Sequence, residues 1–135
     1  MLDRFATPLL RTPLQAMARL LVRAGVGANA VTLAGFGVGL FAAILIANGA
    51  YAAGAIALLT SRLLDGLDGA VARETQPTDA GGFLDISLDF LFYASIPLAF
   101  AVAEPTTNAL PAAALLAAFI GTGSSFLAFA TLAAK

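Results

Sequence analysis

The sequence predicts an all-α polytopic membrane protein that forms one membrane domain, residues 1–135. Hydrophobic residues make up 60% of the chain and charged residues only 11%, whereas about a quarter of the residues in a soluble domain are charged. The apolar residues form four long runs separated by short polar turns. In a four-span arrangement, all 7 Lys and Arg residues fall on one side of the membrane. Together these observations predict an N-terminal interfacial helix followed by four transmembrane helices.

The first predicted element is the interfacial helix, residues 1–24. Its arginines alternate with apolar residues, a mixture too basic to cross a bilayer but apolar enough to lie among the headgroups. We expect Pro8 and Pro13 to kink this helix or delay its start, and Gly25-Val26-Gly27 to end it. The charges and prolines also interrupt the apolar stretch that a signal peptide would need.

The four apolar runs each approach the ~20 residues that cross a ~30 Å bilayer core. We expect Asn29 to cap the first span, Asn48-Gly49 to form the turn after it, and Thr78 or Asp79 to cap the third. Residues 104–108 are predicted as the turn before the fourth. The predicted spans are about 29–47, 51–72, 80–103 and 111–133.

The cations predict the orientation, because Lys and Arg in short loops are biased to the cytoplasm. Both termini and the polar loop after the second span are therefore expected in the cytoplasm, together with the site described next. The cations concerned are Arg4, Arg11, Arg19, Arg23, Arg62, Arg73 and Lys135.

Four aspartates lie inside or beside the apolar runs. Asp65 and Asp68 are three residues apart, and Asp85 and Asp89 are four apart, so each pair projects from one helix face. The pairs flank a single loop, which predicts adjacent antiparallel helices with four converging carboxylates. An ionised carboxylate at the bilayer centre costs roughly 2.5–3.5 kcal/mol. A compensating partner is therefore expected, and we predict that it is metal.

The composition limits the chemistry of this site. The chain has no Cys and no His, which excludes zinc thiolate sites, histidine bases and cysteine nucleophiles. Carboxylate oxygens suit Mg²⁺ or Mn²⁺, and two such ions would neutralise the four aspartates. The sequence thus favours a two-metal centre of the kind that acts on phosphorus. Arg73 can bind phosphate through two nitrogens, whereas Arg62 is expected to be a membrane anchor or a partner of a carboxylate.

These residues resemble the signature of the CDP-alcohol phosphotransferase family, also called CDP-alcohol phosphatidyltransferases. The pattern is Asp-x-x-Asp-Gly-x-x-Ala-Arg followed by Gly-x-x-x-Asp-x-x-x-Asp, with one residue fewer than usual in the intervening loop. Upstream, Asn29-Ala30-Val31-Thr32 is a weaker match to a Pro-Asn-x-x-Thr stretch of the family, with Ala28 in place of Pro. The matching positions of the main signature are Asp65, Asp68, Gly69, Ala72, Arg73, Gly81, Asp85 and Asp89.

The resemblance implies transfer of a phosphatidyl or other substituted phosphate group from a CDP-alcohol, typically CDP-diacylglycerol, to an acceptor alcohol. CMP is released, and the product is a phospholipid. Asp65, Asp68 and Asp85 would then hold the metals, and Asp89 would be the general base and a further metal ligand. The CMP moiety would be bound by Gly69, Ala72, Arg73 and Gly81.

The family usually has six spans, and the resemblance covers the first four. We expect either that the chain is a fragment or that it is a reduced member that borrows surface from a partner. The resemblance also implies a homodimer. We further expect a bacterial or archaeal cell membrane and no nucleic-acid partner. The acceptor alcohol cannot be read from the sequence.

Two other classes remain open at this stage. A carboxylate-based ion-coupled transporter would place its aspartates near the bilayer midplane, on inverted repeats. A non-catalytic membrane scaffold could retain the same pattern of aspartates. Metal-dependent release of CMP separates both classes from the enzyme.

Overall fold

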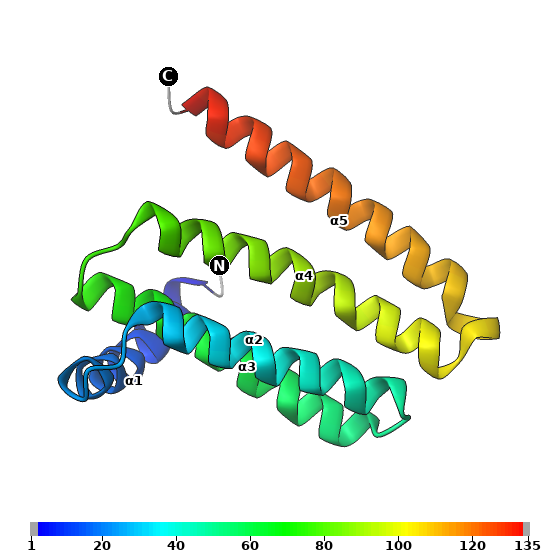
Figure 1. Ribbon diagram of the computed structural model, residues 1–135, viewed down its shortest axis with the longest axis horizontal. Helices are drawn as coiled ribbons and strands as arrows, with labels where there is room; N and C mark the ends of the chain where they lie inside the picture. The colour runs from blue at the N-terminus through cyan, green and yellow to red at the C-terminus, as the bar shows by residue number, and fades with distance from the viewer. Residues whose placement is uncertain (1–2, 134–135) are drawn as a thin grey trace.

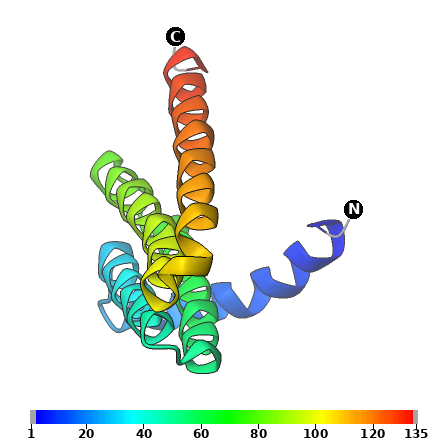
Figure 2. The same cartoon turned by 90° about the vertical axis from the view of Figure 1, so that its right-hand side faces the viewer.

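The computed structural model describes residues 3–133, and the side chains of residues 12–133. This part of the chain is helical, and α2 to α5 run back and forth while α1 extends away from one end of the bundle (Figures 1 and 2). The side chains of Arg4, Arg11 and Lys135, used above to predict the orientation, lie outside the described residues. The helices are α1 Asp3–Arg23, α2 Ala28–Ala47, α3 Tyr51–Glu74, α4 Asp79–Ala103 and α5 Pro105–Ala133.

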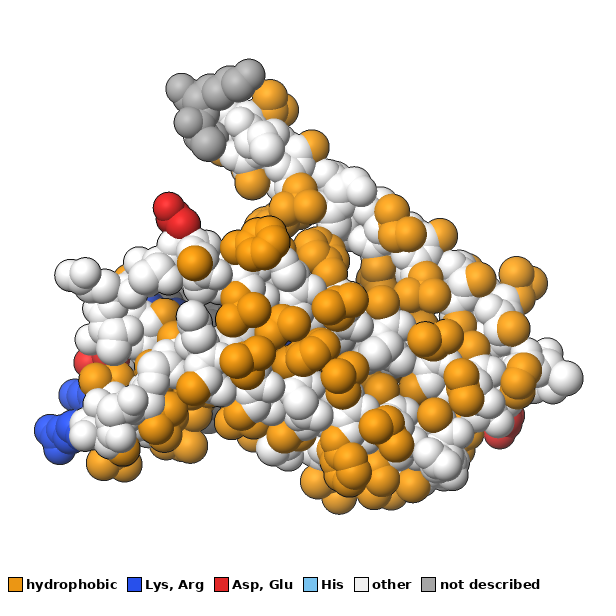
Figure 3. All heavy atoms as spheres, in the orientation of Figure 1, with side chains coloured by type: hydrophobic (Ala, Val, Ile, Leu, Met, Phe, Trp, Pro, Cys, Tyr) orange, Lys and Arg blue, Asp and Glu red, His pale blue; other side chains and the backbone are white. Residues whose placement is uncertain are grey.

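The predicted fold class, an all-α polytopic membrane protein, is confirmed. Helices α2, α4 and α5 are long and apolar enough to cross a membrane. Hydrophobic side chains cover most of the face shown in Figure 3, and the charged groups gather at its ends. Outward-facing residues such as Leu110 and Phe129 are 80% and 71% exposed. Helix α3 carries charged residues along its second half, and its passage across the membrane stays a prediction.

Helix α2 packs closely against α3 because small residues let the two backbones approach. A Cβ added at Gly54 would lie 2.6 Å from Cγ1 of Ile46, and one added at Gly35 would lie 3.1 Å from Cβ of Leu64. Ser61, fully buried on α3, donates a hydrogen bond to the carbonyl of Gly35 at 2.8 Å. These contacts fix the rotation of α3 about its axis, and therefore the direction of its acidic face.

Helix α1 packs on the C-terminal half of α3. Ala18 is fully buried against Leu67 and Val71, while Arg19 and Arg23 remain exposed. This division into one packed and one charged face agrees with the predicted amphipathic helix. The helix is continuous from Asp3 to Arg23, so the two prolines do not delay its start.

The turns that reverse the chain follow the sequence prediction in part. Gly25 and Gly49 adopt φ values of +77° and +78° after α1 and α2, which glycine tolerates better than other residues. Thr78 caps α4 by accepting a hydrogen bond from the amide of Gly81 at 3.1 Å. The prediction of Asn29 as a cap is wrong, because α2 begins at Ala28 with Gly27 as its N-cap.

The turn predicted over residues 104–108 is also shorter than expected. Only Glu104 interrupts the helices, and α5 begins at Pro105 rather than near residue 111. Proline is well tolerated at the first helical position because its missing amide hydrogen has no partner there. The amide of Asn108 then bonds to the carbonyl of Glu104 at 2.9 Å.

Helices α3 and α4 are antiparallel, as the sequence predicts (Figure 1), but their backbones stay apart. Among the described residues, no Cα of α3 lies within 8 Å of a Cα of α4, whereas α2 contacts both helices and α5 contacts α4. Side chains alone therefore bridge α3 and α4. The resulting space holds the aspartates.

We predict that Gly39→Ala destabilises the bundle. A Cβ there would lie 2.5 Å from Cδ2 of Phe92 and 2.9 Å from Oγ of Ser61, and Phe92 is only 2% exposed. The expected loss is about 1–3 kcal/mol of unfolding free energy, typical of overpacking. Gly37→Ala on the same helix is the control, because a Cβ at Gly37 meets nothing within 4 Å. Thermal unfolding in detergent micelles measures both; equal midpoints would contradict the prediction.

Candidate functional site

Three of the four predicted aspartates meet across the space between α3 and α4. One carboxylate oxygen from each of Asp65, Asp68 and Asp85 lies within 4.8 Å of the others. Asp65 and Asp68 lie on the second half of α3, and Asp85 lies on the first half of α4. Because the two helices run in opposite directions, these halves face one another at the same end of the bundle (Figure 1).

This cluster has the properties that a hard divalent cation requires. Asp68 is only 5% exposed, and its Oδ2 atom is buried without a hydrogen-bond partner among residues 12–133. A buried acceptor left unpaired costs about 1–3 kcal/mol, and more when it is charged. The adjoining cavity of about 10 Å³ is lined by all four aspartates, and a space of this size holds one water-sized occupant. Charge, donor type and space therefore fit a carboxylate-bound cation.

Asp89 lines the same cavity but has a different partner. Its Oδ1 atom accepts a hydrogen bond from Nη1 of Arg62 at 3.0 Å. The same Nη1 atom lies 3.5 Å from Oδ2 of Asp65. Arg62 is thus a partner of two carboxylates, one of the alternatives that the sequence left open. Its spacing of three residues from Asp65 on one helix was the available signal.

A second and larger cavity lies beside the aspartates, with a volume of about 350 Å³. Asp68, Asp85 and Thr32 line both cavities, so the two spaces adjoin. The larger one is bounded by the start of α2, the end of α3 and the loop that leads into α4. The remaining lining residues are Gly27, Ala28, Asn29, Gly69, Ala72, Thr75, Gln76, Pro77, Thr78, Gly81 and Gly82.

Three of the four residues predicted to bind a nucleotide line this cavity: Gly69, Ala72 and Gly81. Arg73 does not line it; this residue is exposed, and its Nη1 atom would lie 3.4 Å from a Cβ added at Gly69. The guanidinium therefore lies at the margin of the cavity.

The sequence reasoning gave no site role to Asn29 and Thr32, which line the cavity from α2. The weak upstream resemblance over Asn29-Ala30-Val31-Thr32 was the available signal. A Cβ added at Gly81 would lie 3.0 Å from Oδ1 of Asn29. The Asn29 side chain thus approaches the backbone of α4 across the cavity, and the glycine leaves it the space to do so.

Comparisons with known proteins identify relatives of this chain. The chain is 55% identical over 135 residues to the inner membrane protein YnjF of Escherichia coli, an alignment that covers all of this chain and 66% of that protein. It is 46% identical over 70 residues to the archaetidylinositol phosphate synthase of Methanothermobacter thermautotrophicus, covering 51% of this chain and 36% of the synthase. The chain thus spans slightly less than two thirds of the Escherichia coli relative. No solved structure matches it.

The family comparison covers both cavities. The family model described as CDP-alcohol phosphatidyltransferase matches residues 26–135, which include α2 to α5 and all four aspartates. The chain belongs to the CDP-alcohol phosphatidyltransferase family.

Proposed function

We propose that this chain carries the catalytic centre of an enzyme that transfers a phosphatidyl or other substituted phosphate group from a CDP-alcohol to an acceptor alcohol. The observation that carries the proposal is the carboxylate cluster of Asp65, Asp68 and Asp85 beside a cavity of about 350 Å³. A cation site next to a space for a nucleotide, in a membrane protein of this family, suits a lipid-linked diphosphate as the donor.

Asp65, Asp68 and Asp85 would hold the cations, with Asp89 as a further ligand on the other side of the small cavity. We propose Mg²⁺ or Mn²⁺, and two ions for the complete site, since the four carboxylates carry enough charge for both. When bound, such ions neutralise the diphosphate and stabilise the charge that develops on its oxygens.

Asp89 is the proposed general base. The acceptor oxygen forms a bond to the β-phosphorus of the CDP-alcohol, the bond between that phosphorus and the oxygen of CMP breaks, and the hydroxyl proton passes to Asp89. A carboxylate is the base that the composition offers, because the chain has no His and no Cys. Its place on the cavity wall beside the cluster puts it close to where the reacting phosphate would sit.

The larger cavity is the proposed site for the CMP moiety. Gly69, Ala72 and Gly81 present little side-chain bulk there, which leaves backbone groups open to a nucleotide. We assign Arg73 to the margin, where its guanidinium can bind a phosphate or ribose oxygen.

The proposed setting is phospholipid biosynthesis in a bacterial or archaeal cell membrane, with CDP-diacylglycerol as the donor. The name of the archaeal relative, a synthase of archaetidylinositol phosphate, supports a lipid product. The cations at the cluster's end of the bundle favour a cytoplasmic site and cytoplasmic termini. We also propose that the protein forms a homodimer and that the acceptor alcohol is water-soluble.

A transporter is less well supported by the positions of the aspartates. An ion-coupled carrier would bind its ions near the middle of the spans. The clustered aspartates instead lie in the halves of α3 and α4 that adjoin their connecting loop.

The first prediction from the proposed function concerns CMP release. The full-length protein in detergent micelles should release CMP from CDP-diacylglycerol when Mg²⁺ and a suitable acceptor from a panel of alcohols are present, and EDTA should stop the release.

Asp68→Asn should weaken Mn²⁺ binding by more than about 100-fold. Residues that only hydrogen-bond to a metal ligand already contribute about 10- to 100-fold to metal affinity, and a direct ligand should contribute more. Asp79→Asn, an exposed position in the first turn of α4, is the control. Metal binding without CMP release for any acceptor would refute the proposed reaction.

The second prediction separates the base from the other metal ligands. Asp89→Asn should lower the rate of CMP release by about 10²- to 10⁴-fold, the contribution of a general base. The same change should leave binding of the first Mn²⁺ ion nearly intact, because Asp89 is not part of the cluster of three. A variant with near-normal turnover would show that another group takes the proton.

The third prediction concerns the nucleotide cavity. Gly81→Ala would place a Cβ 3.0 Å from both Asn29 Oδ1 and Thr78 Oγ1, which displaces groups on the cavity wall. We expect KM for the CDP-alcohol to rise roughly tenfold, since small displacements near a reacting group have effects of up to about 100-fold. Gly37→Ala, with open space around it, is the control outside the cavity. An unchanged KM would place the nucleotide elsewhere.

A further inference from the structure

The two sides of the carboxylate site differ in how their charge is compensated. On one side, Asp68 Oδ2 is buried and has no hydrogen-bond partner in the part of the chain that the structure describes. On the other, a single nitrogen, Arg62 Nη1, lies 3.0 Å from Asp89 Oδ1 and 3.5 Å from Asp65 Oδ2. This nitrogen bridges carboxylates from α3 and α4. A bridging divalent ion would make the same connection.

The surrounding residues hold the Arg62 guanidinium in this place. Its Cζ atom lies 3.9 Å from the centre of the Phe92 ring, a favourable position for a cation over an aromatic face. Phe92 is itself fixed against Gly39 of α2, where no side chain would fit. A long contact of 3.5 Å joins Nη2 to Oγ of Ser61, which is fully buried. Arg62 is therefore part of a packed assembly of three helices.

The arrangement is nevertheless not fully satisfied. The Nε atom of Arg62 is buried and has no hydrogen-bond partner among the described residues, and a buried donor without a partner is unfavourable. A guanidinium that left this position could regain partners in water or on a phosphate. A divalent cation, which carries more charge than a guanidinium, can therefore displace Arg62 from the two carboxylates.

We infer that Arg62 is an internal cation that occupies the place of the second divalent ion, between Asp65 and Asp89, and leaves these carboxylates when that ion binds. The inference rests on the proposed function, since it concerns the order in which the same site is loaded. The first ion binds at Asp65, Asp68 and Asp85, where Arg62 makes only its longer contact, 3.5 Å to Asp65, and Asp68 Oδ2 has no partner among the described residues. The second ion binds more weakly, because it has to displace Arg62. Arg62 is a positioning residue that keeps the charge of Asp89 compensated until then.

Binding of Mn²⁺ to the metal-free, full-length protein in micelles tests this inference, measured by calorimetry and by electron paramagnetic resonance of free Mn²⁺. The wild type should show one tight and one weak ion. Arg62→Gln should raise the affinity for the second ion by about 5- to 150-fold, the usual range of coupling between sites, and change the first less than about twofold. Arg23→Gln, which removes an exposed cation from α1, is the matched control and should change neither.

Two further variants test whether Arg62 competes with the second ion. Arg62→Gln combined with Asp89→Asn should return the second ion to weak binding, because a ligand is lost. If Arg62→Gln does not fold, Arg62→Lys replaces it; lysine lacks the planar fork, so a smaller increase is expected. An unchanged or lower affinity for the second ion, or an equal increase for both ions, would overturn the inference. Those results would leave the proposed function intact, whereas a wild type that binds no Mn²⁺ would overturn both.

Discussion

Four carboxylates inside a bundle with an apolar outer surface need positive charge close by, and much of the structure serves that need. The cluster of Asp65, Asp68 and Asp85 brings three of them together, and one buried oxygen of Asp68 has no partner within the described part of the chain. Arg62 compensates the remaining side, against Asp89. The site is therefore asymmetric before any ion binds. Such asymmetry would give the loading of the proposed two-ion centre a natural order.

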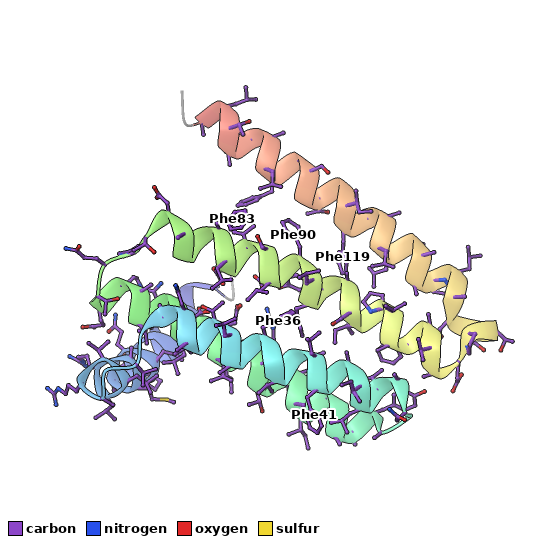
Figure 4. All side chains as sticks on the ribbon, viewed as in Figure 1. Phe36, Phe41, Phe83, Phe90 and Phe119 are labelled. Carbon is purple, nitrogen blue, oxygen red and sulfur yellow. The ribbon has the colours of Figure 1, made fainter. Side chains whose placement is uncertain are left out.

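Helix α2 carries no acidic or basic residue, yet it determines the geometry of the site. It contacts both α3 and α4, which do not approach one another closely. The carbonyl of Gly35 accepts a hydrogen bond from Ser61 on α3, and Gly39, which has no side chain, leaves room for Phe92 from α4. Phe36, which lies between these two glycines in the sequence, is labelled in Figure 4. The spacing set by α2 leaves room for cations between the carboxylates. A direct packing of α3 on α4 would have removed that room.

The sequence predicted the all-α membrane class, the helices and the convergence of Asp65, Asp68 and Asp85, because apolar run lengths and helical spacing are local properties. The predictions were wrong or incomplete where contacts between residues far apart in the sequence determine the structure. Asn29 lies at a helix start, but its side chain faces the cavity beside Gly81 and does not cap the helix. The bridging contact of Arg62 with Asp89 depends on how α2 separates the other helices, which no local pattern records. The ligand, base and nucleotide roles remain predictions.

The packing of α1 on α3 links the site to its depth in the bilayer. Ala18 of α1 is buried against Leu67, which precedes Asp68 on the chain, and Val71, which follows it by three residues. A helix that lies among the headgroups would therefore hold the carboxylates at a set distance below the lipid surface. In a thicker or thinner membrane the mismatch would be taken up at the far ends of α4 and α5. The reacting diphosphate of a membrane-embedded substrate would still meet the carboxylates at the same level.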